Sequence, residues 1–146
     1  MTPEEQLDQF IDRFVPQVAA DARAGLAMVR KRLPGAVRLV YDNYNALAIA
    51  FASNEKASSI ICSIALYPRW ASLFLMNGPS LPDPLGLLEG AGGTMRHVKL
   101  TPALIDSEGV AALIDAAAAS MALPIDPAGE ERLVIKSVSA RQRPRR

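Results

Sequence analysis

The spacing of apolar residues changes at residue 36, and this change constrains the fold more than any other feature of the sequence. Near the amino terminus, four apolar residues follow the i, i+3, i+4, i+7 spacing of a helix with one apolar face: Leu7, Phe10, Ile11 and Phe14. After residue 36, apolar residues alternate with a period of two, over 37–42 and again over 47–52. Helices followed by alternating strands are typical of an α+β domain.

Two amino-terminal helices are predicted. Thr2 is suited to cap the first helix, because Pro3 fits the first helical position and Glu5 completes a capping box. Pro16 interrupts that helix and can begin the second. The basic run 30–32 suits the carboxyl end of the second helix, which stops at 33–35.

Five strands are predicted, in antiparallel hairpins. They cover 37–42, 47–52, 58–66, 70–76 and 96–100. Small alanines alternate with bulky residues over 46–52, and we expect the amino-terminal helices to pack closely on that alanine face. A glycine- and proline-rich loop covers 77–94, and a last helix runs from Ser107 to about Leu123.

These elements predict an α+β domain over residues 1–123, with an antiparallel sheet of about five strands packed against two amino-terminal helices and one carboxy-terminal helix. Residues 124–146 form an extension. Its strand-like run 132–136 leaves two alternatives, an edge strand of this sheet or a contact with a second copy in a homo-oligomer. The basic end, 141–146, is predicted to be disordered.

The composition of the chain argues against a membrane protein and against a secreted protein. No apolar run approaches the roughly 20 residues of a membrane span, and no secretory signal is visible, so a cytoplasmic protein without a membrane partner is predicted. Cys62, the one cysteine, lies in an apolar run and is predicted to be a buried structural thiol. Five of the 16 basic residues lie in 136–146, which holds no acidic residue, so residues 1–135 carry 11 basic and 15 acidic residues.

A concentration of polar and aromatic residues at the strand ends predicts a binding site. If the strands follow one another as hairpins, the junctions after the first and third strands meet at one end of the sheet. The cluster comprises Tyr41, Asp42, Asn43, Tyr44, Asn45, Tyr67, Arg69 and Trp70, with Arg96 and His97 from the last strand. The alternative is structural: the Asx side chains would bond their own turn, while Tyr67 and Trp70 would fill the core.

Several of these strings resemble the YdhG-like family, a domain of unknown function whose members include frataxin-like intracellular iron chaperones. The resemblance spans about residues 3–123. It is carried by Pro34-Gly35, Tyr41 to Ala46, Ala65 to Trp70, Pro82-Asp83-Pro84 and Arg96-His97. It implies an α+β fold, and it raises iron as a ligand.

Frataxins carry an acidic ridge on their first helix, and a short stripe here is similar to it: Glu4, Glu5, Asp8 and Asp12. Oxygen ligands without histidine or thiolate would hold iron weakly and near the surface. The alternative is that these carboxylates complement the helix dipole and solvate the outer face.

Other chemistries find less support. His97, the one histidine, has no nucleophile in a triad arrangement, and a single cysteine and histidine cannot build a structural zinc site. The glycines of 90–93 lack the spacing of a phosphate-binding loop. The basic tail has no interleaved aromatic residue and the body is acidic, which does not favour nucleic acid.

The sequence thus predicts a non-enzymatic cytoplasmic module without a cofactor, which binds a small ligand or a protein segment at the strand-junction cluster. Arg69 and Arg96 would pair an anionic group, and Tyr44 and Trp70 would stack on the ligand. The alternative function is a frataxin-like chaperone that holds iron weakly on the acidic first helix.

Overall fold

Both amino-terminal helices form where the sequence predicts them. In the computed structural model, which describes residues 1–146, α1 covers Pro3–Asp12 and α2 covers Pro16–Arg32. The Oγ1 of Thr2 accepts a hydrogen bond from the Glu5 amide at 3.1 Å, which confirms the predicted cap. α2 carries three basic residues in its last turn, where they complement the helix dipole.

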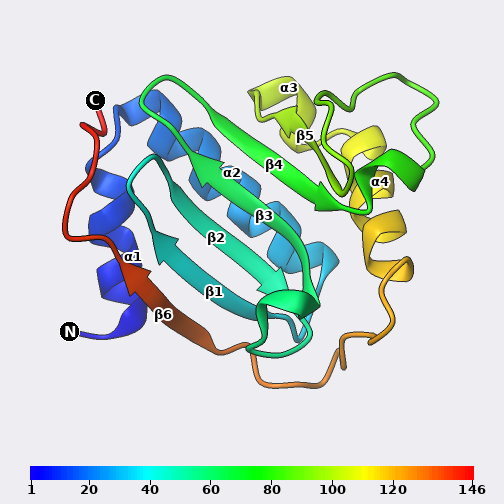
Figure 1. Cartoon of the computed structure of the whole chain (residues 1–146), viewed down its shortest axis with the longest axis horizontal. Helices are drawn as coiled ribbons and strands as arrows, with labels where there is room; N and C mark the ends of the chain where they lie inside the picture. Colours follow the sequence, from blue (N-terminus) through cyan, green and yellow to red (C-terminus); the bar gives the residue numbers. More distant parts are fainter.

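The sheet has six strands and is mixed, whereas an antiparallel sheet of about five was predicted. The strands are β1 (Val37–Asp42), β2 (Leu47–Ala52), β3 (Ile60–Leu66), β4 (Ala71–Met76), β5 (Met95–Lys99) and β6 (Leu133–Val138), and their order is β5-β4-β3-β2-β1-β6. The first five pair antiparallel through hairpins and one long loop. In Figure 1 the linker from α4 crosses below the ends of the strands to the opposite edge, so β6 enters the sheet at the end where β1 begins and pairs parallel with β1. The strand-like run therefore covers an edge of its own sheet.

The carboxy-terminal helical part has two helices where one was predicted. α3 (Pro102–Ile105) precedes α4 (Glu108–Ala119), and Thr101 and Ser107 cap them. α4 ends at Ala119 instead of near Leu123, because Ser120 already closes the last turn through bonds to carbonyls of the helix. The loop between β4 and β5 contains one 3₁₀ turn, Gly78–Ser80, and a bridge between Glu89 and His97.

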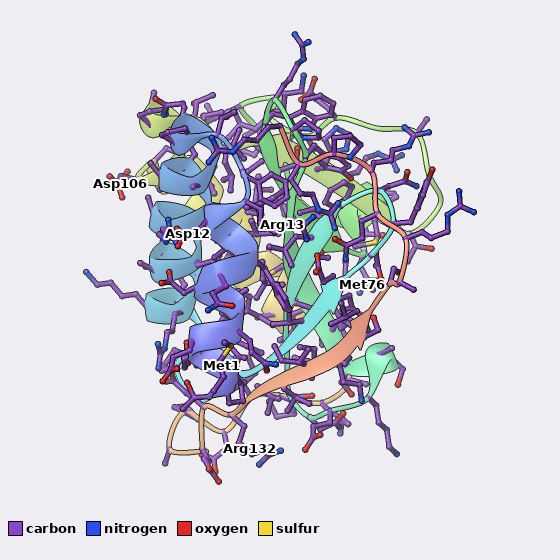
Figure 2. All side chains as sticks on the ribbon, turned by 90° about the vertical axis from the view of Figure 1, so that its left-hand side faces the viewer. Met1, Asp12, Arg13, Met76, Asp106 and Arg132 are labelled. Carbon is purple, nitrogen blue, oxygen red and sulfur yellow. The ribbon has the colours of Figure 1, made fainter.

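The helices cover one face of the sheet, and it is the bulky face. Figure 2 shows α1 and α2 together on one side, with β6 at the near edge. Leu47, Ile49 and Phe51 belong to the core shared with these helices. Ala50 and Ala52 lie with Leu39 in a separate small cluster. The prediction that the helices pack on the alanine face was wrong, because the larger side chains bury more apolar area under a helix.

The turn that ends α2 depends on Gly35. Its φ is +85°, and a Cβ at this position would lie 1.9 Å from the carbonyl oxygen of Asp126. The Gly35 amide also donates to Oε2 of Glu131 at 3.0 Å. A side chain here would therefore disturb both the turn and the connection to β6.

We expect Gly35→Ala to lower the free energy of unfolding by at least about 2 kcal/mol, because the new side chain adds left-handed strain and a backbone clash. Urea unfolding followed by circular dichroism measures this. Gly93→Ala is the matched control, since nothing lies within 4 Å of its Cβ position. Equal urea midpoints for the two variants would contradict the argument.

Candidate functional site

Two tight turns meet at one end of the sheet, as the hairpin argument predicts. The turn between β1 and β2 closes through the Asn43 amide and the Ala46 carbonyl at 3.0 Å. The turn between β3 and β4 closes through the Tyr67 amide and the Trp70 carbonyl at 2.8 Å. Leu47 pairs with Leu66 across β2 and β3, so the two turns are neighbours (Figure 1).

A cleft of about 1190 Å³ lies against these turns, and we call it the aromatic-basic cleft. Its lining consists of Val15, Asn45, Tyr67, Pro68, Arg69, Trp70, Arg143, Pro144 and Arg146. Four of these residues belong to the predicted cluster. The lining holds three arginines and no acidic residue, so it favours an anion.

The aromatic wall of the cleft is a stacked pair. The ring centroids of Tyr67 and Trp70 are 5.0 Å apart, with 24° between the planes. Trp70 is 41 % exposed, so the alternative that it fills the core fails. Lys99 Nζ lies 5.1 Å from the Trp70 centroid and adds a cation to that ring. Burial raises the pKa of the Tyr67 phenol.

The carboxy-terminal end is held at this site, whereas disorder was predicted for 141–146. Arg145 is only 4 % exposed, and its Nη2 donates to Asp42 Oδ1 at 2.8 Å and to the Asn43 carbonyl at 2.6 Å. Its guanidinium lies 5.6 Å from the Phe14 ring centroid. A buried carboxylate on β1 therefore binds the tail. Disorder was predicted because the local sequence of 141–146 does not show that a buried carboxylate on a distant strand pairs with Arg145.

The docked tail supplies two arginines that sequence reasoning did not assign to the site. The Arg143 amide donates to the Tyr44 carbonyl at 2.9 Å, and its guanidinium lies 5.7 Å from the Tyr44 ring centroid. Arg146 Nε donates to the Arg13 carbonyl at 3.0 Å, at the end of α1. In Figure 1 the red end of the chain runs beside α1 toward the two turns. The sequence did contain one sign of this docking: residues 1–135 carry more acidic than basic residues, whereas residues 136–146 are basic only.

Three members of the predicted cluster contact other parts of the protein and do not face the cleft. Asp42 is 1 % exposed and pairs with Arg145, and Asn43 Oδ1 accepts from Ser137 at 3.5 Å. Tyr41 packs on the small cluster of the opposite sheet face. None of the three lines the cleft, and neither does Tyr44, so the prediction that Tyr44 stacks on a ligand there was wrong. The Tyr44 ring lies against Arg143 instead.

Arg96 and His97 lie outside the cleft. The register of β4 and β5 pairs Arg96 with Leu75, near the far end of β4, and places Lys99 opposite Ser72 instead. Arg96 donates to the carbonyls of Gly92 and Met95 in its own loop. The His97 ring packs on Phe74, with centroids 5.2 Å apart.

The acidic residues of the first helix are mostly ion-paired. Arg23 Nη2 donates to Oδ1 of both Asp8 and Asp12 at 2.7 Å. Glu4 pairs with Arg38 at 2.7 Å, whereas Glu5 is exposed. No group of three or more histidine, cysteine or acidic residues is placed to hold a metal ion. A cation at this stripe would compete with Arg23.

Comparison with known proteins leaves the family open. No family model matches the chain, and neither a curated protein nor a solved structure matches it. The resemblance to the YdhG-like family stays a prediction from the motifs. None of the helices combines the length and the apolar character needed to cross a membrane.

We expect Arg145→Gln to lower the free energy of unfolding by about 3 kcal/mol, because it removes the hydrogen-bonded cation of the buried Asp42 and leaves only Arg13, whose Nη1 lies 3.9 Å from Asp42 Oδ2. Urea unfolding measures the loss. Arg141→Gln, which removes an exposed charge of the same tail, is the control. In a double-mutant cycle with Asp42→Asn, the double variant should lose less than the sum of the two single losses. Additive losses would contradict the pairing.

Cys62 gives a second test of the core. It is fully buried on β3, and burial raises the pKa of its thiol to about 12. We expect the native protein to resist a disulfide reagent such as DTNB at about pH 8, since the thiolate is the reactive form. Guanidinium should then release one reactive thiol per chain. Rapid labelling of the native protein would show that β3 opens.

Proposed function

We propose that this protein is a cytoplasmic binding module, without catalytic activity, for a small anionic ligand that carries a planar ring. The observation that supports this most directly is the exposed Tyr67–Trp70 stack bordered by arginines in the aromatic-basic cleft. Trp70 stacks on Tyr67 and lies under Lys99 Nζ, yet 41 % of it is exposed, so part of its ring is accessible to a ligand.

The aromatic wall suits a planar ring. Stacking of a base on an aromatic side chain contributes about 1–3 kcal/mol and tolerates different rings, because every such ring has a π face. Pro68 and Pro144 add rigid apolar surface beside the stack. A ligand ring would therefore bury apolar area on groups that lose little conformational freedom.

The basic wall suits a phosphate or carboxylate. Arg69, Arg143 and Arg146 come from two separate segments and line the same cleft. None of the three forms an ion pair with a carboxylate of the protein. The guanidinium groups of Arg69 and Arg143 are thus available for the two-pronged hydrogen bonds that arginine makes to these anions. Arg146 already donates from Nε and Nη2 to the carbonyls of Arg13 and Asp12, so it contributes mainly its charge.

The lining supports binding in preference to catalysis. It contributes rings, guanidinium groups and the amide of Asn45, and it includes no carboxylate, imidazole or thiol. General acid–base chemistry needs a group of that kind within hydrogen-bond reach of the substrate. The sequence-predicted His97 lies elsewhere on β5.

Trp70 provides the assay, because it is the only tryptophan in the chain. We expect adenosine monophosphate, which joins a planar base to an anion, to quench the Trp70 emission on titration. Adenosine, which lacks the phosphate, should bind at least about tenfold more weakly through the loss of charge-assisted hydrogen bonds.

Two arginine variants test the basic wall. Arg69→Gln and Arg143→Gln should each weaken binding of adenosine monophosphate about tenfold. Arg141→Gln is the matched control, because it removes a charge from the same tail but does not line the cleft. Equal affinities for nucleotide and nucleoside, or equal effects of Arg141→Gln and Arg143→Gln, would contradict the proposal.

A further inference from the structure

Arg145 occupies a socket whose walls all belong to the folded body of the protein, and we call it the Asp42 socket. Its walls are the Asp42 carboxylate, the Asn43 carbonyl and the Phe14 ring. Arg145 Nη2 donates to the two oxygens, and its guanidinium lies beside the ring. Acceptor oxygens next to an aromatic ring suit a planar guanidinium group, which can bond and stack at once. None of the three wall residues lines the aromatic-basic cleft.

The tail is held in this socket by one buried side chain. Arg145 is the only buried residue of 139–146, and the segment contains no helix or strand. It buries no apolar side chain. Segments with so few buried apolar contacts open locally at a lower free energy than the whole fold. We therefore expect the tail to leave the socket while the sheet and the helices stay folded.

The tail fills the socket incompletely. Asp42 is 1 % exposed, yet its Oδ2 accepts no hydrogen bond, and the buried Nε of Arg145 donates none. Arg13 Nη1 lies 3.9 Å from Oδ2, which is too far for a hydrogen bond. An arginine can bond both oxygens of a carboxylate through two parallel N–H groups, whereas Arg145 bonds only one. An arginine that is not tethered to β6 is free to adopt the two-pronged arrangement.

The surface beside the socket offers acceptors for a peptide. The Tyr44 carbonyl accepts from the amide of Arg143, two residues before the arginine in the socket, at 2.9 Å. The carbonyls of Arg13 and Asp12 accept from the Arg146 side chain at 3.0 and 3.3 Å. These carbonyls lie at the carboxyl end of α1, where the helix dipole favours a cation. The site therefore suits a peptide with two consecutive arginines better than it suits a free guanidinium ion.

From these observations we infer that the Asp42 socket is a binding site for an arginine of a second polypeptide, and that the protein's own tail is its exchangeable occupant. The ligand is a short basic segment in which one arginine enters the socket and the next reaches the end of α1. Its charge is complementary to residues 1–135, which carry 15 acidic and 11 basic residues. Binding of this segment displaces the tail, and with it Arg143 and Arg146 from the aromatic-basic cleft.

A fluorescent peptide with the sequence of residues 141–146 tests the inference by fluorescence anisotropy. The full-length Arg145→Ala variant has an empty socket. It should bind the peptide at least about tenfold more tightly than the wild type, in which the tethered Arg145 competes at a high effective concentration. Arg145→Lys keeps a cation beside Asp42 but lacks the planar fork, so this second variant should also bind more tightly than the wild type. Circular dichroism checks the fold of both variants.

Two matched controls separate the socket from a general attraction between a basic peptide and an acidic body. A peptide that carries Arg145→Lys keeps its net charge and should bind Arg145→Ala at least about tenfold more weakly. Asp42→Asn, added to Arg145→Ala, removes the carboxylate and should weaken the original peptide to a similar degree. The inference is overturned if the folded variants do not bind the peptide, if the wild type binds it equally tightly, or if either control leaves the affinity unchanged.

Discussion

The arrangement of this protein depends on the burial of one face of its sheet under α2. Ala22 and Val29 of this helix are fully buried, and a Cβ on Gly25 would lie 2.8 Å from Leu100 and 3.1 Å from Ile64. The helix therefore lies very close to the sheet. α1 packs beside α2 on the same side of the sheet (Figure 2).

A buried ion pair attaches the carboxy-terminal end of the chain to the sheet. Asp42 lies at the end of β1 on the helix-facing side, and Arg145 reaches it from the tail. Without Arg145, the buried Asp42 carboxylate would be left in a low-dielectric environment with only the more distant Arg13, at 3.9 Å. The pair positions Arg143 and Arg146 beside the turns of the sheet. The aromatic-basic cleft therefore combines the turn 67–70 with a tail segment that follows it by more than 70 residues, at 143–146.

Particular elements show how far the sequence determined the structure. The cap at Thr2, the two amino-terminal helices, the first five strands and the meeting of the two turns follow from local signals: proline positions, hydrophobic period and hairpin order. The position of Tyr67 and Trp70 at a strand junction was also predicted, whereas their stacking and the exposure of Trp70 are seen only in the structure. The same reasoning failed for Arg96 and His97, because the register of β5 along β4 depends on the length and path of the loop 77–94.

By itself, the sequence determined the α+β class, the helical and strand segments and the residues at the strand junctions, because periodicity and turn chemistry act over a few neighbouring residues. Tertiary structure alone decided that the bulky face of β2 lies under the helices, that β6 joins β1 in parallel, and that the basic tail is held by Asp42. These outcomes depend on contacts between distant segments. They form because they bury apolar area and pair buried charges across the whole fold, and neither quantity can be calculated from a short stretch of sequence.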